Sequence, residues 1–382
     1  DALYRLALDL AGKGPAALAL RPAVDSKAVR GYRLATQESP TPQKANAAAV
    51  TASLAADASV QAALRQLVGR GATLLLANAA GSQEVADPEF VHQARVAVRR
   101  MRSAARALGR DAGWPASLDD ELRWIARLLG AVRDWDVLQA HTAPALLAAL
   151  PATAPLVERA AERRLRDDAA LRAALGGARY ARLALRLLRW ANSAADQGIT
   201  LGSAAPARLA RMHRRLFDAA AFFVALPVRR QHRVRILAKR LRYALDLFAS
   251  TLPEKRTRRY VERLAHLQDE LGALNDAVVA SGLLRRLSRA AGVDPLPAGE
   301  WLQRQRERQD VNGIPCIMAT RADFDGAARL YCLLNGSAGG QTTKLTKMES
   351  DLLAAEGGQS RFPKRPHGPG WGEHPGRDTG YP

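Results

Sequence analysis

The stretch His92-Gln-Ala-Arg95-Val-Ala-Val-Arg99-Arg100-Met-Arg102 places basic side chains three and four residues apart, with small or apolar residues between them. Side chains at this spacing lie along one side of an α-helix. Arg106 continues the series by one more turn. The stretch therefore predicts a helix with an apolar side that faces a core and a continuous basic stripe on another side.

A second stretch repeats this pattern 140 residues further along the chain. It reads His232-Arg-Val-Arg235-Ile-Leu-Ala-Lys239-Arg240-Leu-Arg242-Tyr243, so both copies fit H-x-x-R-x-x-x-[RK]-R-x-R. A matching motif follows each copy, Leu129-Gly-Ala-Val-Arg133-Asp134 and then Leu271-Gly-Ala-Leu-Asn275-Asp276, at an offset of 142. Two motifs in the same order and at nearly the same separation predict an internal duplication. We expect two duplicated helical bundles, about 54–195 and 204–292, related by an approximate twofold.

Composition supports an all-α protein. Hydrophobic residues make up 48% of the 382-residue chain and aromatic residues only 5%, which is typical of helices rich in Ala and Leu. A strand-like piece ending in Gly31–Leu34 is the exception. Helical segments are expected at 54–76, where Gly81 and Ser82 end the pattern, and at 87–108, 117–139, 153–175, 177–195, 204–224, 229–251, 254–272 and 275–291.

The two ends of the chain differ from this body. Residues 1–35 form a separate short unit, and 36–53, with Pro40 and Pro42, read as a linker. The body covers 54–295, and the remainder, 296–382, is expected to be irregular, with disorder from about 336. No run of apolar residues is long enough to span a membrane and no signal peptide is visible, so we expect a cytoplasmic protein.

The charge of the chain indicates a polyanionic partner. Lys and Arg number 57 against 37 Asp and Glu, a formal net charge of +20. Like charges four residues apart destabilise a helix, yet no acidic residue occurs between Phe90 and Arg110, or between Ala219 and Leu245. An external anion would supply the counter-charge, and two facing stripes would form a basic groove or pore. A solvated basic face, or pairing with acids of neighbouring helices, is the alternative.

The other polar residues of the two motifs allow several roles. His92 and His232 head the stripes and could contact phosphate, make a structural hydrogen bond, or hold a metal together. Arg133, Asp134, Asn275 and Asp276 interrupt apolar helices, where they could orient the stripe arginines or cap helix ends. Cys316 and Cys332 have no metal-ligand spacing, and we expect neither a cofactor nor a dedicated metal site.

The two basic stretches and the motifs that follow them resemble the CHAD family, the conserved histidine α-helical domain. The resemblance covers about 54–292 and implies two antiparallel four-helix bundles related by a pseudo-twofold. It also implies polyphosphate binding in a basic central cavity and recruitment to polyphosphate granules. Carried over position by position, it implies these ligands: His92, Arg95, Arg99, Arg100, Arg102, His232, Arg235, Lys239, Arg240 and Arg242.

The start of the chain is similar to the C-terminal end of CYTH domains, which are triphosphate tunnel enzymes. The similarity rests on Ala2–Leu8 and Ser26–Tyr32. The paired-glutamate metal motif of that family lies in an N-terminal strand that this chain lacks, so we expect a binding protein and not an enzyme.

Three other functions stay open from the sequence. The charge would allow nucleic-acid binding, although the stripes lack the interleaved aromatic residues that stack on bases. The chain could be an accessory part of a CYTH-type triphosphatase, or a helical scaffold whose charge is incidental. Oligomeric state is not predicted.

Overall fold

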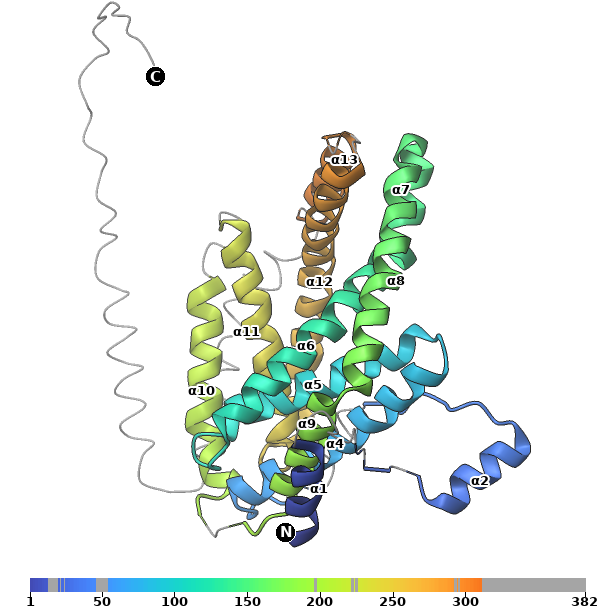
Figure 1. Cartoon of the computed structure of the whole chain (residues 1–382). Coiled ribbons are helices and arrows are strands. Elements are labelled where there is room, and N and C mark those ends of the chain that lie inside the picture. The colour runs from blue at the N-terminus through green and yellow to red at the C-terminus, as the bar shows by residue number, and fades with distance from the viewer. Residues whose placement is uncertain are drawn as a thin grey trace, which may run out of the picture. The chain divides into compact units, whose positions relative to one another are not determined.

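In the part of the chain that it describes, the structure, a computed structural model, contains helices and no strand, apart from one isolated β-bridge between Ser59 and Thr200 (Figure 1). It describes residues 1–12, 20, 22–23, 25–45, 54–195, 198–220, 223, 226–291, 294 and 296–310. Its α-helices are α1 (Ala2–Gly12), α2 (Lys27–Thr36), α4 (Val60–Glu84), α5 (Pro88–Leu108), α6 (Ala116–Val137), α7 (Ala143–Ala149), α8 (Ala154–Gly176), α9 (Ala178–Ala191), α10 (Leu201–Ala220), α11 (Val228–Leu247), α12 (Glu254–Ala291) and α13 (Leu296–Asp310). The prediction of an all-α protein is confirmed.

The strand-like reading of Gly31–Leu34 is wrong, because these residues lie inside α2. The helix begins after Ser26, whose hydroxyl accepts a hydrogen bond from the backbone N–H of Val29 at 3.2 Å, as an N-cap does. The Arg33 guanidinium also reaches back to Asp25 at 2.6 Å. Capping and this ion pair favour a helix over a strand. The similarity of residues 1–35 to a CYTH end remains a prediction.

The expected linker at 36–53 is non-helical over its described part, 37–45, but it is anchored to the body. The amide of Asn78 accepts a hydrogen bond from the backbone N–H of Gln43 at 3.0 Å and donates one to the Gln43 carbonyl oxygen at 3.0 Å. Residues 46–53 lie outside the described part of the chain.

Helix α4 continues through Gly81 and Ser82, where the sequence predicted an end. Gly81 is buried, and a Cβ atom placed there would overlap the ring of Phe90, a fully buried residue of α5. The glycine therefore allows α4 and α5 to approach closely. Glycine signals a helix end and a close helix contact equally well, and the local sequence does not separate the two.

Helix α5 begins as predicted from Asp87, Pro88 and Glu89. The Asp87 carboxylate accepts a hydrogen bond from the Glu89 backbone N–H at 2.8 Å, and Pro88 occupies the first turn. One side of α5 then buries ten side chains, among them Val98 and Met101, against the core. The stripe arginines are left on the remaining surface, as the periodicity predicted.

Two helices differ from their predicted bounds. Helix α10 spans Leu201–Ala220, so it begins and ends a few residues before the predicted 204–224, and it contains Pro206 in its interior. Helix α12 runs unbroken for 38 residues where two helices, 254–272 and 275–291, were predicted.

The continuity of α12 follows from its packing on two separate hydrophobic clusters. Leu264, Leu267 and Leu271 belong to the main core with α4, α5, α6, α9, α10 and α11. Ala280, Leu283 and Leu284 belong to a second cluster with the end of α6, α7, α8 and α13. Burial on both sides of Gly272 holds the helix together across the glycine.

The chain after 296 was predicted to be irregular. This prediction is wrong for Leu296–Asp310, which forms α13. Helix α13 packs against α12, and Ala298 and Leu302 are buried in the second cluster. The residues after 310, including the predicted disorder from 336, lie outside the described part. No helix among the described residues has the length and hydropathy to span a membrane.

The close contact at Gly81 provides a test of this packing. We expect Gly81→Ala to lower the free energy of unfolding by about 1–3 kcal/mol, because the added methyl group must displace Phe90. Gly282→Ala in α12 is the matched control. A Cβ there meets no atom within 4 Å, so higher helix propensity should leave stability unchanged or raise it by up to about 1 kcal/mol. Urea denaturation of both variants measures the difference, and equal stability would contradict the close contact.

Candidate functional site

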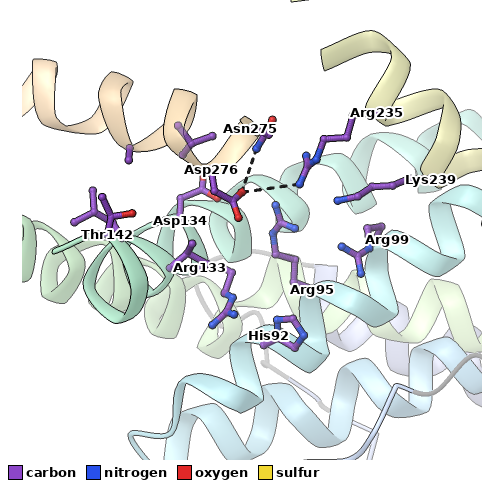
Figure 2. A pocket seen from close by; sticks show the side chains of 14 residues that line it. His92, Arg95, Arg99, Arg133, Asp134, Thr142, Arg235, Lys239, Asn275 and Asp276 are labelled. Carbon is purple, nitrogen blue, oxygen red and sulfur yellow. Dashed lines mark hydrogen bonds and ion pairs between the residues drawn. The ribbon is translucent and has the colours of Figure 1, made fainter. Parts of the chain in front are cut away.

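Helices α5 and α11 pack against each other and turn part of both basic stripes toward one cavity of about 350 Å³. Helices α6 and α12 bring the polar residues of the following motifs to the same place. Figure 2 shows these side chains converging from the four helices. The cavity is lined by His92, Arg95, Arg99, Arg133, Asp134, Val137, Leu138, Thr142, Arg235, Lys239, Asn275, Asp276, Val279 and Ala280.

A second cavity of about 470 Å³ adjoins the first, since Arg99, Arg235, Lys239 and Asp276 line both. Its other lining residues are Arg100, Arg242, Tyr243, Asp246, Gln268, Asp269 and Gly272. We call the two adjoining cavities the central groove. Seven of the ten predicted ligands line it, which confirms that residues from both repeated stretches come together: His92, Arg95, Arg99, Arg100, Arg235, Lys239 and Arg242.

The cations of the central groove are poorly solvated and repel one another. Burial lowers the pKa of Arg95 and of Arg235, and the neighbouring charge of Arg99 lowers both further. The effect is largest for Lys239, whose pKa falls to about 7, first through burial and then through Arg235, Arg99 and Arg95. A bound anion would relieve both the burial and the repulsion.

The arginine side chains in the two repeated stretches also have unused hydrogen-bond donors. The Nε atoms of Arg99, Arg100, Arg102, Arg235, Arg240 and Arg242 are buried and have no hydrogen-bond partner within the described chain. A buried donor without a partner costs about 1–3 kcal/mol, so native proteins rarely keep several together. Guanidinium donors in this state suit an acceptor from outside the protein, such as a phosphate oxygen.

Carboxylates lie among these cations, as the sequence suggested for Asp134 and Asp276. Asp276 approaches the Arg235 guanidinium at 4.0 Å and accepts a long hydrogen bond from Asn275 at 3.4 Å (Figure 2). Burial raises the pKa of Asp134, and the opposing charge of Arg95 partly offsets the effect. Asp276 lies close to a stripe arginine from the interior of α12. Asp134 lies in the last turn of α6, which the π-helical turn Leu138–Thr142 continues, and its charge acts on Arg95.

The two histidines occupy different surroundings. His92 lines the central groove, and burial followed by the charge of Arg133 lowers its pKa, which favours the neutral ring near pH 7. His232 is exposed, and its Nδ1 lies 2.8 Å from the Asn275 side-chain oxygen, to which it can donate a hydrogen bond. Among the described residues, no group of three or more His, Cys, Asp or Glu side chains could hold a metal.

Three of the predicted ligands, Arg102, Arg240 and His232, do not line the central groove. Arg102 approaches Asp119 of α6 at 3.8 Å, and its neighbours in charge include Arg106 and Arg240. Arg102 and Arg240 therefore lie at another part of the α5–α11 pair, whereas His232 contacts Asn275 of the groove wall. Whether a stripe residue lines the groove depends on its distance from the point where α5 and α11 cross. Helical periodicity alone does not reveal that point.

Sequence reasoning missed several residues of the groove. The guanidinium groups of Arg99 and Arg100 lie 5.5 and 5.8 Å from the centre of the Tyr243 ring, so this ring of α11 contacts two arginines of α5. Gln268 accepts a hydrogen bond from Arg242 at 3.4 Å, and Asp246 lines the groove. Asp246 was visible in the sequence as the residue four positions after Arg242. Gln268 and Asp269 carried no such signal, because their role depends on the path of α12.

Comparison with known proteins agrees with this arrangement. The family model of the CHAD domain matches residues 60–285, which include both basic stretches and both motifs that follow them. The chain belongs to the CHAD domain family. No curated protein matches this CHAD protein at a significant level.

Solved structures that are similar to this CHAD protein include the following two. The CHAD domain from the plant Ricinus communis is 31% identical, with a TM-score of 0.59, over 76% of this chain and 96% of that one. PptA from Streptomyces chartreusis is 19% identical, with a TM-score of 0.53, over 71% of this chain and all of that one. The second likeness concerns the fold alone.

The low pKa of Lys239 makes the stability of the CHAD domain depend on pH. The unfolded chain keeps the lysine proton up to about pH 10.5, and the folded chain releases it near pH 7. Between these values the unfolded state binds more protons, so the free energy of unfolding rises with pH. We expect Lys239→Met to remove about 1–3 kcal/mol of that rise between about pH 7 and 9.5. Urea denaturation at each pH measures it.

The exposed Lys44, which lies outside the groove, provides the control for the preceding experiment. The Lys44→Met protein should keep the pH profile of the unchanged protein. If Lys239→Met keeps that profile as well, Lys239 is not held at a lowered pKa by the groove.

Proposed function

We propose that this CHAD protein binds inorganic polyphosphate in the central groove, as a binding protein that catalyses no reaction. The observation that carries the proposal is the set of buried guanidinium Nε donors without a partner, which belong to both repeated stretches. Phosphate oxygens accept such donors readily, and Arg keeps its charge under all physiological conditions.

A linear anion fits this site better than a compact one does. The two adjoining cavities hold about 350 and 470 Å³ and share a middle part lined by Arg99, Arg235 and Lys239. Cations therefore extend through both cavities and do not surround one point. An unbranched chain of phosphates presents charge at regular intervals along such a path. The seven lining ligands and the family to which the chain belongs support this ligand class together.

Nucleic acid fits the groove less well. Binding of single strands commonly uses several aromatic side chains as stacking platforms, and Tyr243 is the aromatic residue that lines the groove. The Tyr243 ring already makes cation–π contacts with Arg99 and Arg100. Carboxylates of Asp134, Asp246, Asp269 and Asp276 further limit the length of purely basic surface that a nucleic-acid backbone would meet.

We further propose that the two halves of the protein are pseudo-twofold related bundles that share one ligand. The packing supports this, since α5 lies between α4 and α6 as α11 lies between α10 and α12, and α5 contacts α11. The offset of 140 then pairs Arg95 with Arg235 and Arg99 with Lys239, and all four line the groove. Recruitment of the protein to polyphosphate granules would follow from binding.

The first test is a charge reversal at the middle of the groove. We expect Arg99→Glu combined with Lys239→Glu to abolish polyphosphate binding while circular dichroism shows unchanged helicity. Binding by the unchanged protein should weaken steeply with salt through release of counterions. The matched control is Arg5→Glu combined with Lys27→Glu, which makes the same charge change on exposed residues of α1 and α2.

Two outcomes would contradict the assignment. Binding that survives the double substitution would show that the groove is not the site. Equal affinity for DNA and polyphosphate at matched phosphate concentration would favour a general nucleic-acid binder. Titration in the presence and absence of a chelator should give the same affinity, because the site is built from cations and the described residues contain no metal-ligand cluster.

Lys239 also makes binding depend on pH. Bound phosphate should raise the lowered pKa of the lysine, so that binding takes up a proton above about pH 7. We expect polyphosphate affinity to fall between about pH 7 and 9, by up to about tenfold per pH unit if one full proton is taken up. Lys239→Arg should keep high affinity over this range, since Arg does not titrate there. Isothermal titration calorimetry in buffers of different ionisation enthalpy measures the proton uptake.

A further inference from the structure

A group of arginines at one end of the α5–α11 pair is not explained by the central groove. It consists of Arg102 and Arg106 of α5 and Arg233 and Arg240 of α11, and we call it the α5 end. The charge of Arg106 lowers the pKa of both Arg102 and Arg240, and Arg233 lowers that of Arg240 further, after burial as the first cause in each case. These four side chains therefore act on one another across the two helices.

The α5 end continues the basic stripe of the groove. Arg99, which lines both cavities, is followed by Arg102 three residues later and Arg106 four residues after that, so each lies beside the next on the surface of α5. From Arg95 to Arg106 the stripe is about 17 Å long at the rise of an α-helix. The Nε atoms of Arg102 and Arg240 are buried without a hydrogen-bond partner in the described chain, like those in the groove, while Arg106 and Arg233 are exposed.

The acid nearest to the α5 end is shared between two arginines. The Asp119 Oδ2 atom accepts two hydrogen bonds from the Arg123 guanidinium, at 3.0 and 2.7 Å, and the Asp119 Oδ1 atom makes only a 3.8 Å ion pair with the Nε atom of Arg102. Asp120 is also paired with Arg123, at 3.0 Å. The carboxylates of α6 therefore leave most of the positive charge at the α5 end without compensation.

The opposite end of the groove has a different charge. There Arg100 and Arg242 are accompanied by the carboxylates of Asp246 and Asp269, all four of which line the cavity. The internal repeat makes the two ends equivalent in position, since the offset of 140 pairs Arg100 with Arg240, Arg242 with Arg102, and Asp246 with Arg106. An acid at one end thus stands where the other end has an arginine.

We propose that a polyphosphate chain too long for the central groove extends in one direction only, over Arg102, Arg106 and Arg240 at the α5 end. This inference rests on the proposed function and adds a polarity to it. Short anions bind in the groove alone, and long chains gain affinity from the α5 end. Asp246 and Asp269 repel the chain at the other end, so the duplicated protein binds its ligand asymmetrically.

The experiment compares tripolyphosphate with long-chain polyphosphate on single variants of the whole protein. Arg106→Asp gives the α5 end the acid that its repeat partner carries, and Arg106→Gln removes the charge without placing an acid in the last turn of α5. Arg30→Asp is the matched control, because Arg30 is an exposed helical arginine outside the groove. Circular dichroism and thermal denaturation confirm that each variant folds.

We expect Arg106→Asp to weaken long-chain binding about tenfold at roughly 50 mM salt, the value of about one phosphate contact, and to lower the salt dependence of long-chain binding. Arg106→Gln should have a smaller effect in the same direction. Tripolyphosphate affinity should change less than about twofold in both variants, because screened charges outside the groove act weakly on a short ligand. Arg30→Asp should change neither affinity.

The results separate the two proposals. If Arg106→Asp leaves long-chain affinity unchanged, or weakens both ligands equally, the extension over the α5 end is wrong while binding in the groove stands. If the unchanged protein binds neither ligand, the proposed function and the extension fail together.

Discussion

The close packing of α5 and α11, two helices that each carry a basic stripe, is the constraint on which the rest of the structure depends. Helices α5 and α11 bury their apolar sides in one core, and this packing leaves arginines of both helices with buried donors and mutual repulsion. The hydrophobic core must offset that repulsion in the absence of a ligand. The pKa values of Lys239, Arg95 and Arg235 are all lowered by this burial and by the repulsion between neighbouring cations. A polyanion would supply the negative charge and the hydrogen-bond acceptors that these arginines lack within the fold.

The sequence predicted the helices and the repeated stripes because both are local properties. Periodicity of three and four residues, the cap at Asp87 and the breaks at proline all act within one or two turns. What it missed depends on distant packing. Gly81 ends no helix because its missing side chain admits Phe90, and Gly272 breaks no helix because α12 is buried on both sides of it. Helix α13 was not predicted, because the sequence loses the composition of the helical body at about residue 296.

The sequence predicted the types of residue in the candidate site, but only partly which of them lie together. Arg95, Arg99, Arg235 and Lys239 meet as the repeat implied, whereas Arg102 and Arg240 lie at one end because the crossing of α5 and α11 divides each stripe. Tyr243 joins the site because its ring reaches both Arg99 and Arg100, a contact between helices that no spacing within one helix encodes. Asp134 and Asp276 were expected as partners of the arginines, whereas Asp246 and Asp269, which also set the charge of the groove, were not.

Helix α12 has a mechanical consequence for this groove. At the rise of an α-helix its 38 residues extend for about 57 Å, and one rod joins the main core to the second cluster. Asn275, Asp276 and Val279 form part of the groove wall between these two anchor points. The wall cannot swing outward by a local loop movement, since it is the middle of a continuous helix. Changing the width of the groove would require bending that rod or releasing one of its two anchors, so the groove is a stiff receptacle whose ligand must adapt to it.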